Sequence, residues 1–212
     1  MKTIYIVRHG ESESNVGGVI SGGDKIALTE HGREQAAFVG ERLSHLPVDI
    51  IVTSTYLRAK QTGEVIAEKI GKPIEHSELF IEWRHGSHRI GKRTHDPELR
   101  ERSKSLVEHL DEPEYRIADE ENFADLNERA EKALQYLLDR TEEHIVVVSH
   151  GWFTPVLLGK AVMEDDFTGR DCKNFIKGFT MKNTGLTILA HGETYFWNKW
   201  HVVTWNDHAH LG

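Results

Sequence analysis

The fold is decided by the stretch Thr3-Ile4-Tyr5-Ile6-Val7-Arg8-His9-Gly10. Its first five residues are all β-branched or aromatic, and the run then stops at an arginine followed by His-Gly. An unbroken run of this kind predicts a strand that is buried on both faces, as in a parallel sheet. The stretch Ile145-Val146-Val147-Val148-Ser149-His150-Gly151 has the same form. Two predicted buried strands therefore each end in a His-Gly pair.

Helical segments alternate with the predicted strands. The apolar pattern that follows Thr29 predicts a capped amphipathic helix running to about Pro47. Residues 49–54 predict another buried strand, and the helix predicted after it ends at Gly71 and Pro73. Strands that alternate with helices predict an α/β fold around a mostly parallel sheet.

The remaining segments complete this fold. Residues 77–105 are less regular, and we expect a loop there with a helix starting near Asp96-Pro97. Residues 123–140 have the spacing of a helix with one buried stripe. A closing hairpin is predicted from strands at 186–190 and 195–204 that are joined by a turn at 191–194.

Composition narrows the class of protein. With 212 residues, 38% of them hydrophobic and 28% charged, the chain is expected to fold as one globular domain. A net charge of −8 argues against general affinity for nucleic acid or an anionic membrane. No stretch approaches the ~18 apolar residues of a membrane span, and the first apolar run is too short for a signal peptide. Because Cys172 is the single cysteine, a reducing compartment fits and the cytoplasm is expected.

The 14 histidines raise the question of a metal site. They are scattered along the chain, whereas a metal site needs clustered ligands with a suitable geometry. His208 and His210 come nearest to a ligand pair, and the alternative is a tail that packs or frays. We expect no metal and no other cofactor.

The two His-Gly pairs give the first indication of function. Open α/β sheets bind ligands just beyond the carboxyl ends of their strands, so His9 and His150 are expected to share one pocket. The alternative is that each histidine only caps its strand. Arg8 and Arg58 favour the pocket, because both follow strands closely and guanidinium groups match phosphate oxygens. For Arg58 alone, a solvated helix position remains the alternative, but together these residues predict a phosphate site.

Four stretches carry a family signature in order and spacing: RHGESESN at 8–15, LTEHGREQA at 28–36, TSTYLRAKQT at 53–62 and VVSHG at 147–151. With them the chain resembles the histidine phosphatase (phosphoglycerate mutase-like) superfamily over nearly its whole length, and Asn183-Thr184-Gly185 is a weaker similarity. The resemblance implies a three-layer α/β/α sandwich with a mostly parallel central sheet. It also implies a single domain of residues 1–212, with 77–105 as a capping insertion over the active site.

The resemblance further implies roles for individual residues. His9 is expected to attack phosphorus, and His150, best as a cation, to hold a nonbridging oxygen together with Arg8 and Arg58. A neutral imidazole is a suitable nucleophile near pH 7 if a hydrogen bond fixes its proton on the other nitrogen. Three further residues are expected to contribute to substrate binding, namely Asn15, Gly151 and Ser21.

The leaving alkoxide needs a proton, and the resemblance implies a carboxylic acid as its source. Glu82 is the candidate, in the sequence Glu82-Trp83-Arg84-His85-Gly86-Ser87, and Glu78 is the alternative. Relatives of the phosphatase type carry a proline at the position of His85, so the local backbone is expected to differ there.

The predicted function is hydrolysis of a small phosphomonoester through a phosphohistidine on His9. Phosphoglycerate mutases of the family carry a Tyr-Gly segment with a lysine and paired arginines after the acid, and this arrangement is absent here. A mutase-type phosphotransferase is the alternative. A noncatalytic phospholigand-binding protein is disfavoured, because a binder has no need of a nucleophile and an acid together. A homodimer is left open.

Residues 84–104 hold seven basic residues against three acids in a chain that is acidic overall. Two interpretations remain open for this basic segment. It docks a second anionic group of the substrate, or it forms a solvated helix and loop surface.

Overall fold

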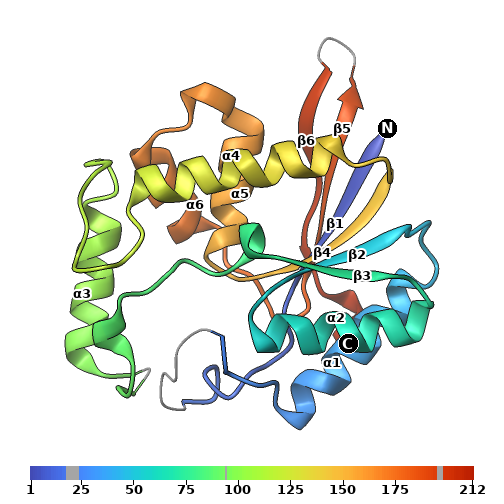
Figure 1. Ribbon diagram of the computed structural model, residues 1–212, viewed down its shortest axis with the longest axis horizontal. Coiled ribbons are helices and arrows are strands. Elements are labelled where there is room, and N and C mark those ends of the chain that lie inside the picture. Colours follow the sequence, from blue (N-terminus) through green and yellow to red (C-terminus); the bar gives the residue numbers. More distant parts are fainter. Residues whose placement is uncertain (18–23, 94, 195–197) are drawn as a thin grey trace.

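The computed structural model describes residues 1–17, 24–93, 95–194 and 198–212. Within these residues a six-stranded sheet has the order β3-β2-β4-β1-β5-β6 (Figure 1). Its strands are β1 (Lys2–Arg8), β2 (Ile50–Ser54), β3 (Ile74–Ser77), β4 (His144–Ser149), β5 (Leu186–Glu193) and β6 (Asn198–Asp207).

The sheet is mostly parallel. Strands β3, β2, β4 and β1 run parallel to one another, and β5 and β6 are antiparallel to their neighbours. In the register of β1 and β4, Arg8 lies opposite Ser149. The two strands therefore end at the same level, which places His9 and His150 side by side with ring centroids 5.1 Å apart.

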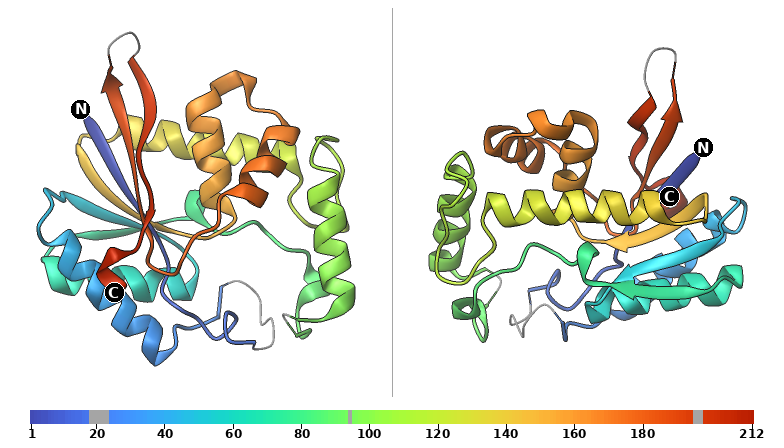
Figure 2. Two further views of the ribbon diagram at one scale, coloured as in Figure 1. Left: turned by 180° about the vertical axis from the view of Figure 1, so that it is seen from behind. Right: turned by 45° about the horizontal axis from the view of Figure 1, so that its top comes forward.

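Helices cover both faces of the sheet (Figures 1 and 2). One face carries α1 (Glu30–Leu43) and α2 (Leu57–Ile70), and the other carries α4 (Phe123–Asp139) and α5 (Phe153–Met163), with α6 (Gly169–Gly178) packed on α5.

Successive residues of β1 point to opposite faces of the sheet. Ile4 and Ile6 pack into the core beneath α4 and α5, whereas Tyr5 and Val7 pack into the core beneath α1 and α2. The predicted three-layer α/β/α architecture is confirmed.

Local sequence signals set several helix ends. Thr29 caps α1, which ends at Leu43, earlier than the expected Pro47. Gly71 ends α2 with a φ of 67°, the left-handed conformation that glycine adopts without steric cost. The helix α3 (Pro97–Glu108) starts after Asp96, whose carboxylate accepts hydrogen bonds from the first turn, as predicted.

Other elements differ from the sequence prediction. The short edge strand β3 was not predicted, because none of its four residues is buried and it has no apolar pattern. Helices α5 and α6 were also missed. Nearly all residues of α5 are buried, so it lacks the one-sided periodicity that marks a surface helix. The predicted turn at 191–194 is wrong in position, since β5 continues to Glu193.

The segment 77–105 contains the short helices η1 (Glu78–Phe80) and η2 (Ser87–Arg89) and most of α3. Helix α3 stands at one end of the molecule, away from the sheet (Figure 1). The role of this segment as a capping insertion stays a prediction. In the part of the chain that the structure describes, no helix is long and apolar enough to cross a membrane.

Candidate active site

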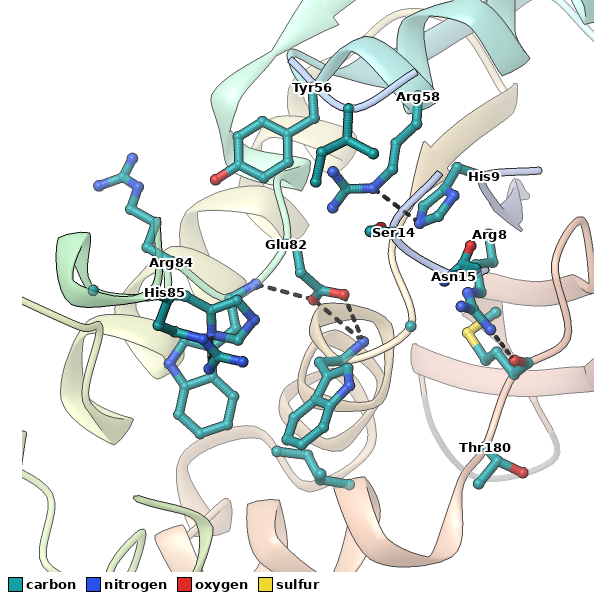
Figure 3. Close-up of a pocket in the computed structure, with 18 of the residues that line it drawn as sticks. Arg8, His9, Ser14, Asn15, Tyr56, Arg58, Glu82, Arg84, His85 and Thr180 are labelled. Carbon is teal, nitrogen blue, oxygen red and sulfur yellow. Dashed lines mark hydrogen bonds between the residues drawn. The ribbon is translucent and has the colours of Figure 1, made fainter. Parts of the chain in front are cut away.

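A cavity of about 700 Å³ opens where the parallel strands end (Figure 3). Segments that directly follow β1, β2, β3 and β4 all contribute to its wall, as expected for a ligand site of an open α/β sheet. The predicted residues that line it are Arg8, His9, Asn15, Arg58, Glu82 and Gly151. Ser21 lies outside the described residues.

The hydrogen bonds of His9 define its tautomer. Arg58 Nε lies 3.1 Å from His9 Nε2, and a guanidinium can only donate. His9 Nε2 therefore carries the lone pair, and Nδ1 carries the proton, which it donates to the Gly10 carbonyl oxygen at 2.7 Å. Burial, together with Arg58 and Arg8, lowers the pKa of His9 well below its usual value. The imidazole is thus neutral near pH 7.

Arg58 is positioned by the first turn of α2, which follows β2 directly. Its side chain is buried, and the hydroxyl group of Thr62, farther along the helix, holds this turn in place. Thr62 Oγ1 donates to the Arg58 carbonyl oxygen at 2.7 Å and accepts from Gly10 N at 3.0 Å. This hydroxyl ties α2 to the loop that carries His9. Thr62 was not among the residues predicted to form the site.

His150 differs from its expected state. It is fully buried behind Arg58 and does not form part of the cavity wall. Its Nδ1 accepts from Arg58 Nη2 at 3.1 Å, so its Nε2 carries the proton and donates to Ser54 Oγ at 2.8 Å. Burial, then Arg58, lowers the pKa of His150 well below its usual value. Solvent exclusion and a neighbouring cation both favour the neutral ring here, opposite to the cation that the resemblance implies.

Arg8 ends β1 and lies along the cavity wall, where its Nη1 donates to the Met181 carbonyl oxygen. Among the described residues, its buried Nε has no hydrogen-bond partner. Burial lowers the pKa of Arg8. The backbone of Gly151 passes so close that a Cβ there would lie 3.3 Å from Arg8 Nε. Gly151 therefore leaves room for the guanidinium.

Two asparagines stabilise the loop that carries His9. Asn183 Nδ2 donates to the His9 carbonyl oxygen at 3.0 Å and to Asn15 Oδ1 at 3.2 Å. Asn15 Oδ1 also accepts from Ser12 N at 3.1 Å. With its oxygen occupied in this way, Asn15 keeps its amide N–H groups for the cavity that it lines. Asn183 received no role from the sequence, where its only signal was the weak Asn-Thr-Gly similarity.

Glu82 lies on the cavity wall with only 9% of its surface exposed. Its carboxylate accepts hydrogen bonds from Trp83 N at 3.0 Å, Phe153 N at 2.9 Å and Trp152 N at 3.2 Å. Two of these donors stand at the start of α5, where the first N–H groups have no acceptor within the helix. The alternative acid Glu78 is exposed and its carboxylate lies 3.7 Å from the guanidinium of Arg84.

The basic segment divides into two groups. Arg84 and Arg89 line the cavity. Lys92 and Arg102 instead form ion pairs with Glu98 on the surface of α3, at 3.1 and 2.9 Å. Docking of a second anionic group of the substrate stays a prediction for Arg84 and Arg89, whereas Lys92 and Arg102 belong to an exposed surface with ion pairs.

The two histidines at the carboxyl end contact protein atoms. His210 Nε2 lies 3.2 Å from Thr184 Oγ1, and His208 Nδ1 lies 2.9 Å from the Asn206 carbonyl oxygen. Across residues 1–17, 24–93, 95–194 and 198–212, no three histidine, cysteine, aspartate or glutamate side chains are grouped to hold a metal ion.

The chain is similar to known proteins over nearly its whole length. A family model described as Histidine phosphatase superfamily (branch 1) matches residues 4–208. A probable phosphoglycerate mutase, GpmB, of Salmonella arizonae is 34% identical over 216 residues, which cover 100% of this chain and 95% of the relative. An uncharacterized phosphatase, PhoE, of Bacillus subtilis is 27% identical over 212 residues, covering 100% and 97%. The solved structure of Bacillus stearothermophilus YhfR is 29% identical and superimposes with a TM-score of 0.79 over 100% of both chains.

Proposed function

The chain belongs to the histidine phosphatase superfamily, branch 1, and from this membership we propose that it hydrolyses a small phosphomonoester through a phosphohistidine on His9. One observation carries the proposal. The unprotonated Nε2 of His9 lies beside the Arg58 guanidinium in a cavity that Glu82 also lines. A nucleophile, a cation and a carboxyl group are the groups that hydrolysis through a phosphohistidine uses.

The phosphoryl group is transferred first to the protein. His9 Nε2 attacks phosphorus while the bond between phosphorus and the ester oxygen breaks. Arg58 gives up its hydrogen bond to Nε2 at this point, because the phosphate oxygens offer it stronger, charged acceptors. Glu82 gives its proton to the departing oxygen, and the alcohol leaves.

Water then releases the phosphate. The Glu82 carboxylate takes a proton from a water molecule, whose oxygen attacks phosphorus as the bond to Nε2 breaks. Orthophosphate leaves, and both His9 and Glu82 return to their starting protonation states. Three backbone N–H groups hold the carboxylate in place between the two steps.

Two arginines stabilise the charge on the transferred group. Phosphoryl transfer depends mainly on positioned positive charge, which the protein supplies without reorganisation. The buried Nε of Arg8, unpartnered in the described part of the chain, is a donor that a phosphate oxygen can use. His150 acts as a positioning residue, since it holds Arg58 from behind at 3.1 Å.

A mutase-type phosphotransferase is the second candidate. It is favoured by the 34% identity to a protein named as a probable phosphoglycerate mutase. Hydrolysis remains our proposal because the Tyr-Gly segment with a lysine and paired arginines is absent after Glu82. An assay of phosphoglycerate interconversion beside the phosphatase assay separates the two.

We also propose a cytoplasmic location, a small phosphorylated substrate without nucleic-acid or membrane partners, and a capping role for 77–105. The single cysteine supports the location. Cys172 is buried, and burial raises the pKa of its thiol to about 12, so it stays a thiol. The net charge of −8 supports the absence of polyanionic partners.

The test is a screen of phosphomonoesters with a His9→Ala variant as the blank. Sugar phosphates, glycerate phosphates, nucleotides and phosphopeptides form the panel. We expect turnover by the wild type only, and quenched mixtures should contain an acid-labile, alkali-resistant phosphoprotein. Turnover by His9→Ala near the wild-type rate would overturn the mechanism.

A further inference from the structure

The cavity is larger than a phosphate group needs. Its volume of about 700 Å³ lies within the range that holds whole organic ligands, typically about 300 to 1,000 Å³. The space beyond His9 can therefore hold a leaving group of this size. The chemistry of the remaining wall then indicates what kind of leaving group fits.

Part of that wall is apolar and exposed. Ile90, Trp152 and Phe179 are 59%, 40% and 36% exposed, although large apolar side chains usually avoid water. They come from three separate segments of the chain and line the same cavity. An exposed apolar patch of this kind, gathered around a polar site, marks a surface that a ligand covers.

The aromatic part of the patch is rigid. Phe179 stacks on Phe175 with ring centroids 4.9 Å apart and meets Trp205 edge-on at 4.9 Å. Trp152 meets Trp83 edge-on at 5.8 Å. These contacts hold the rings in place before a ligand arrives, which reduces the entropy lost on binding.

The cavity also has a cationic side away from the phosphate site. Figure 3 shows Glu82 between the side with Arg8 and Arg58 and the side with Arg84 and His85. The carboxylate of the exposed Glu78 lies 3.7 Å from the Arg84 guanidinium. A separation of 3.7 Å is too long for a hydrogen bond, so the Arg84 guanidinium can bind a further anion.

Arg89 adds a second cation to this side. Its Nη1 donates to His85 Nδ1 at 3.0 Å and lies 3.8 Å from Glu120 Oε1, while its buried Nε has no partner in the described residues. Glu120 is buried and does not line the cavity. Asp119 does line it, but its Oδ1 is held by Ser87 N at 2.9 Å. Two guanidinium groups thus line this side of the cavity together with the Asp119 carboxylate, and each guanidinium lies within 4 Å of one further carboxylate, that of Glu78 or Glu120.

We propose that the substrate is a phosphomonoester of an apolar, ring-sized alcohol or phenol that carries a second anionic group at its far end. The proposal rests on the proposed function, since it takes the phosphoryl group to lie at His9 and Arg58. The ring body covers Ile90, Trp152 and Phe179. The second anion binds Arg84 and Arg89.

Matched probes test the charged contact. We would compare 6-carboxy-2-naphthyl phosphate with its neutral 6-carboxamide, both as substrates of the wild type and as ligands of His9→Ala by calorimetry. A hydrogen bond to a charged group corresponds to about a 10- to 100-fold preference for the carboxylate. Arg84→Gln should lower this preference, because one of the two guanidinium partners of the carboxylate is lost. Arg102→Gln, on the surface of the same basic segment, should preserve it.

Matched variants test the apolar contact. Ile90→Ser should weaken binding of the naphthyl ester about three- to tenfold relative to glycerol phosphate, because it removes apolar surface from the contact. Val203→Ser on β6 is the control, because Val203 is 57% exposed and does not line the cavity.

The outcomes separate the two proposals. Equal affinity for the carboxylate and the carboxamide, or an Arg84→Gln variant that keeps the full preference, would overturn the substrate class even if turnover is rapid. An unchanged naphthyl preference in Ile90→Ser would do the same. Binding preferences as expected without wild-type turnover of any ester would overturn the proposed hydrolysis and leave the ligand class standing.

Discussion

The contact between Arg58 and the two imidazoles offers a sharp test of the site. Arg58 Nε and Nη2 each lie 3.1 Å from a different ring, that of His9 and that of His150. A lysine at this position keeps the positive charge but has one nitrogen, so it cannot contact both rings or bind a phosphate in the forked manner of arginine. Arg58→Lys therefore keeps the positive charge but removes the pair of hydrogen bonds that the guanidinium donates.

The expected loss follows from the contacts. A hydrogen bond to a charged group contributes about 1.5–3 kcal/mol. Two such bonds are lost in Arg58→Lys, because a lysine cannot donate two parallel hydrogen bonds to the phosphoryl oxygens. At about 1.4 kcal/mol for each factor of ten, kcat/KM should fall about 10²- to 10⁴-fold in Arg58→Lys. Arg33→Lys is the control, because Arg33 is exposed on α1.

A companion variant tests the effect of the charge. Burial is the largest cause that lowers the pKa of His9, and the Arg58 charge is the next. Arg58→Gln removes that charge, so the pKa of His9 should rise and the acid limb of kcat/KM should move to higher pH. Arg58→Lys should leave the limb in place.

The assay is kcat/KM for an aryl phosphate from pH 4 to 8, with circular dichroism as a check on folding. An Arg58→Lys enzyme within threefold of wild type would refute the forked contact. If the acid limb of kcat/KM in Arg58→Gln stays at the wild-type pH, the electrostatic coupling between Arg58 and His9 is refuted.

Three further predictions follow from the same geometry. Glu82→Gln should lower kcat about 10²- to 10⁴-fold for an alkyl phosphate. The loss should be much smaller for 4-nitrophenyl phosphate, because its leaving oxygen needs no proton. Equal losses for the two substrates would exclude Glu82 as the acid. Asn183→Ala should lower kcat/KM about tenfold, because two neutral hydrogen bonds that hold the His9 loop are lost, and an unchanged value would show that the loop holds without them. The lowered pKa values of His9 and His150 mean that the unfolded chain binds more protons, so the free energy of unfolding should fall by up to about 1.4 kcal/mol per histidine for each pH unit below 6.5. Urea titrations at pH 7.5 and 5.5 measure this fall, and equal stability at both would contradict the buried neutral state.

Local patterns in the sequence determined the buried strands and several helix ends. The run before Arg8 and the run before His150 predict buried strands because each contains only residues that suit a sheet covered on both faces. Thr29 and Gly71 mark helix ends because their effect on the backbone involves only the next few residues. The placement of His9 at a strand end was therefore predictable.

The packed structure decided the properties that depend on distant parts of the chain. Exclusion from water and the charge of Arg58, 92 positions away in the sequence, lower the pKa of His150. Asn183 reaches the His9 carbonyl across 174 positions, and Glu82 meets the start of α5 across 70. Solvent exclusion and long-range hydrogen bonds exist only after the layers pack, so neither the tautomer of His9 nor the chemistry of the cavity wall is encoded in any short stretch of sequence.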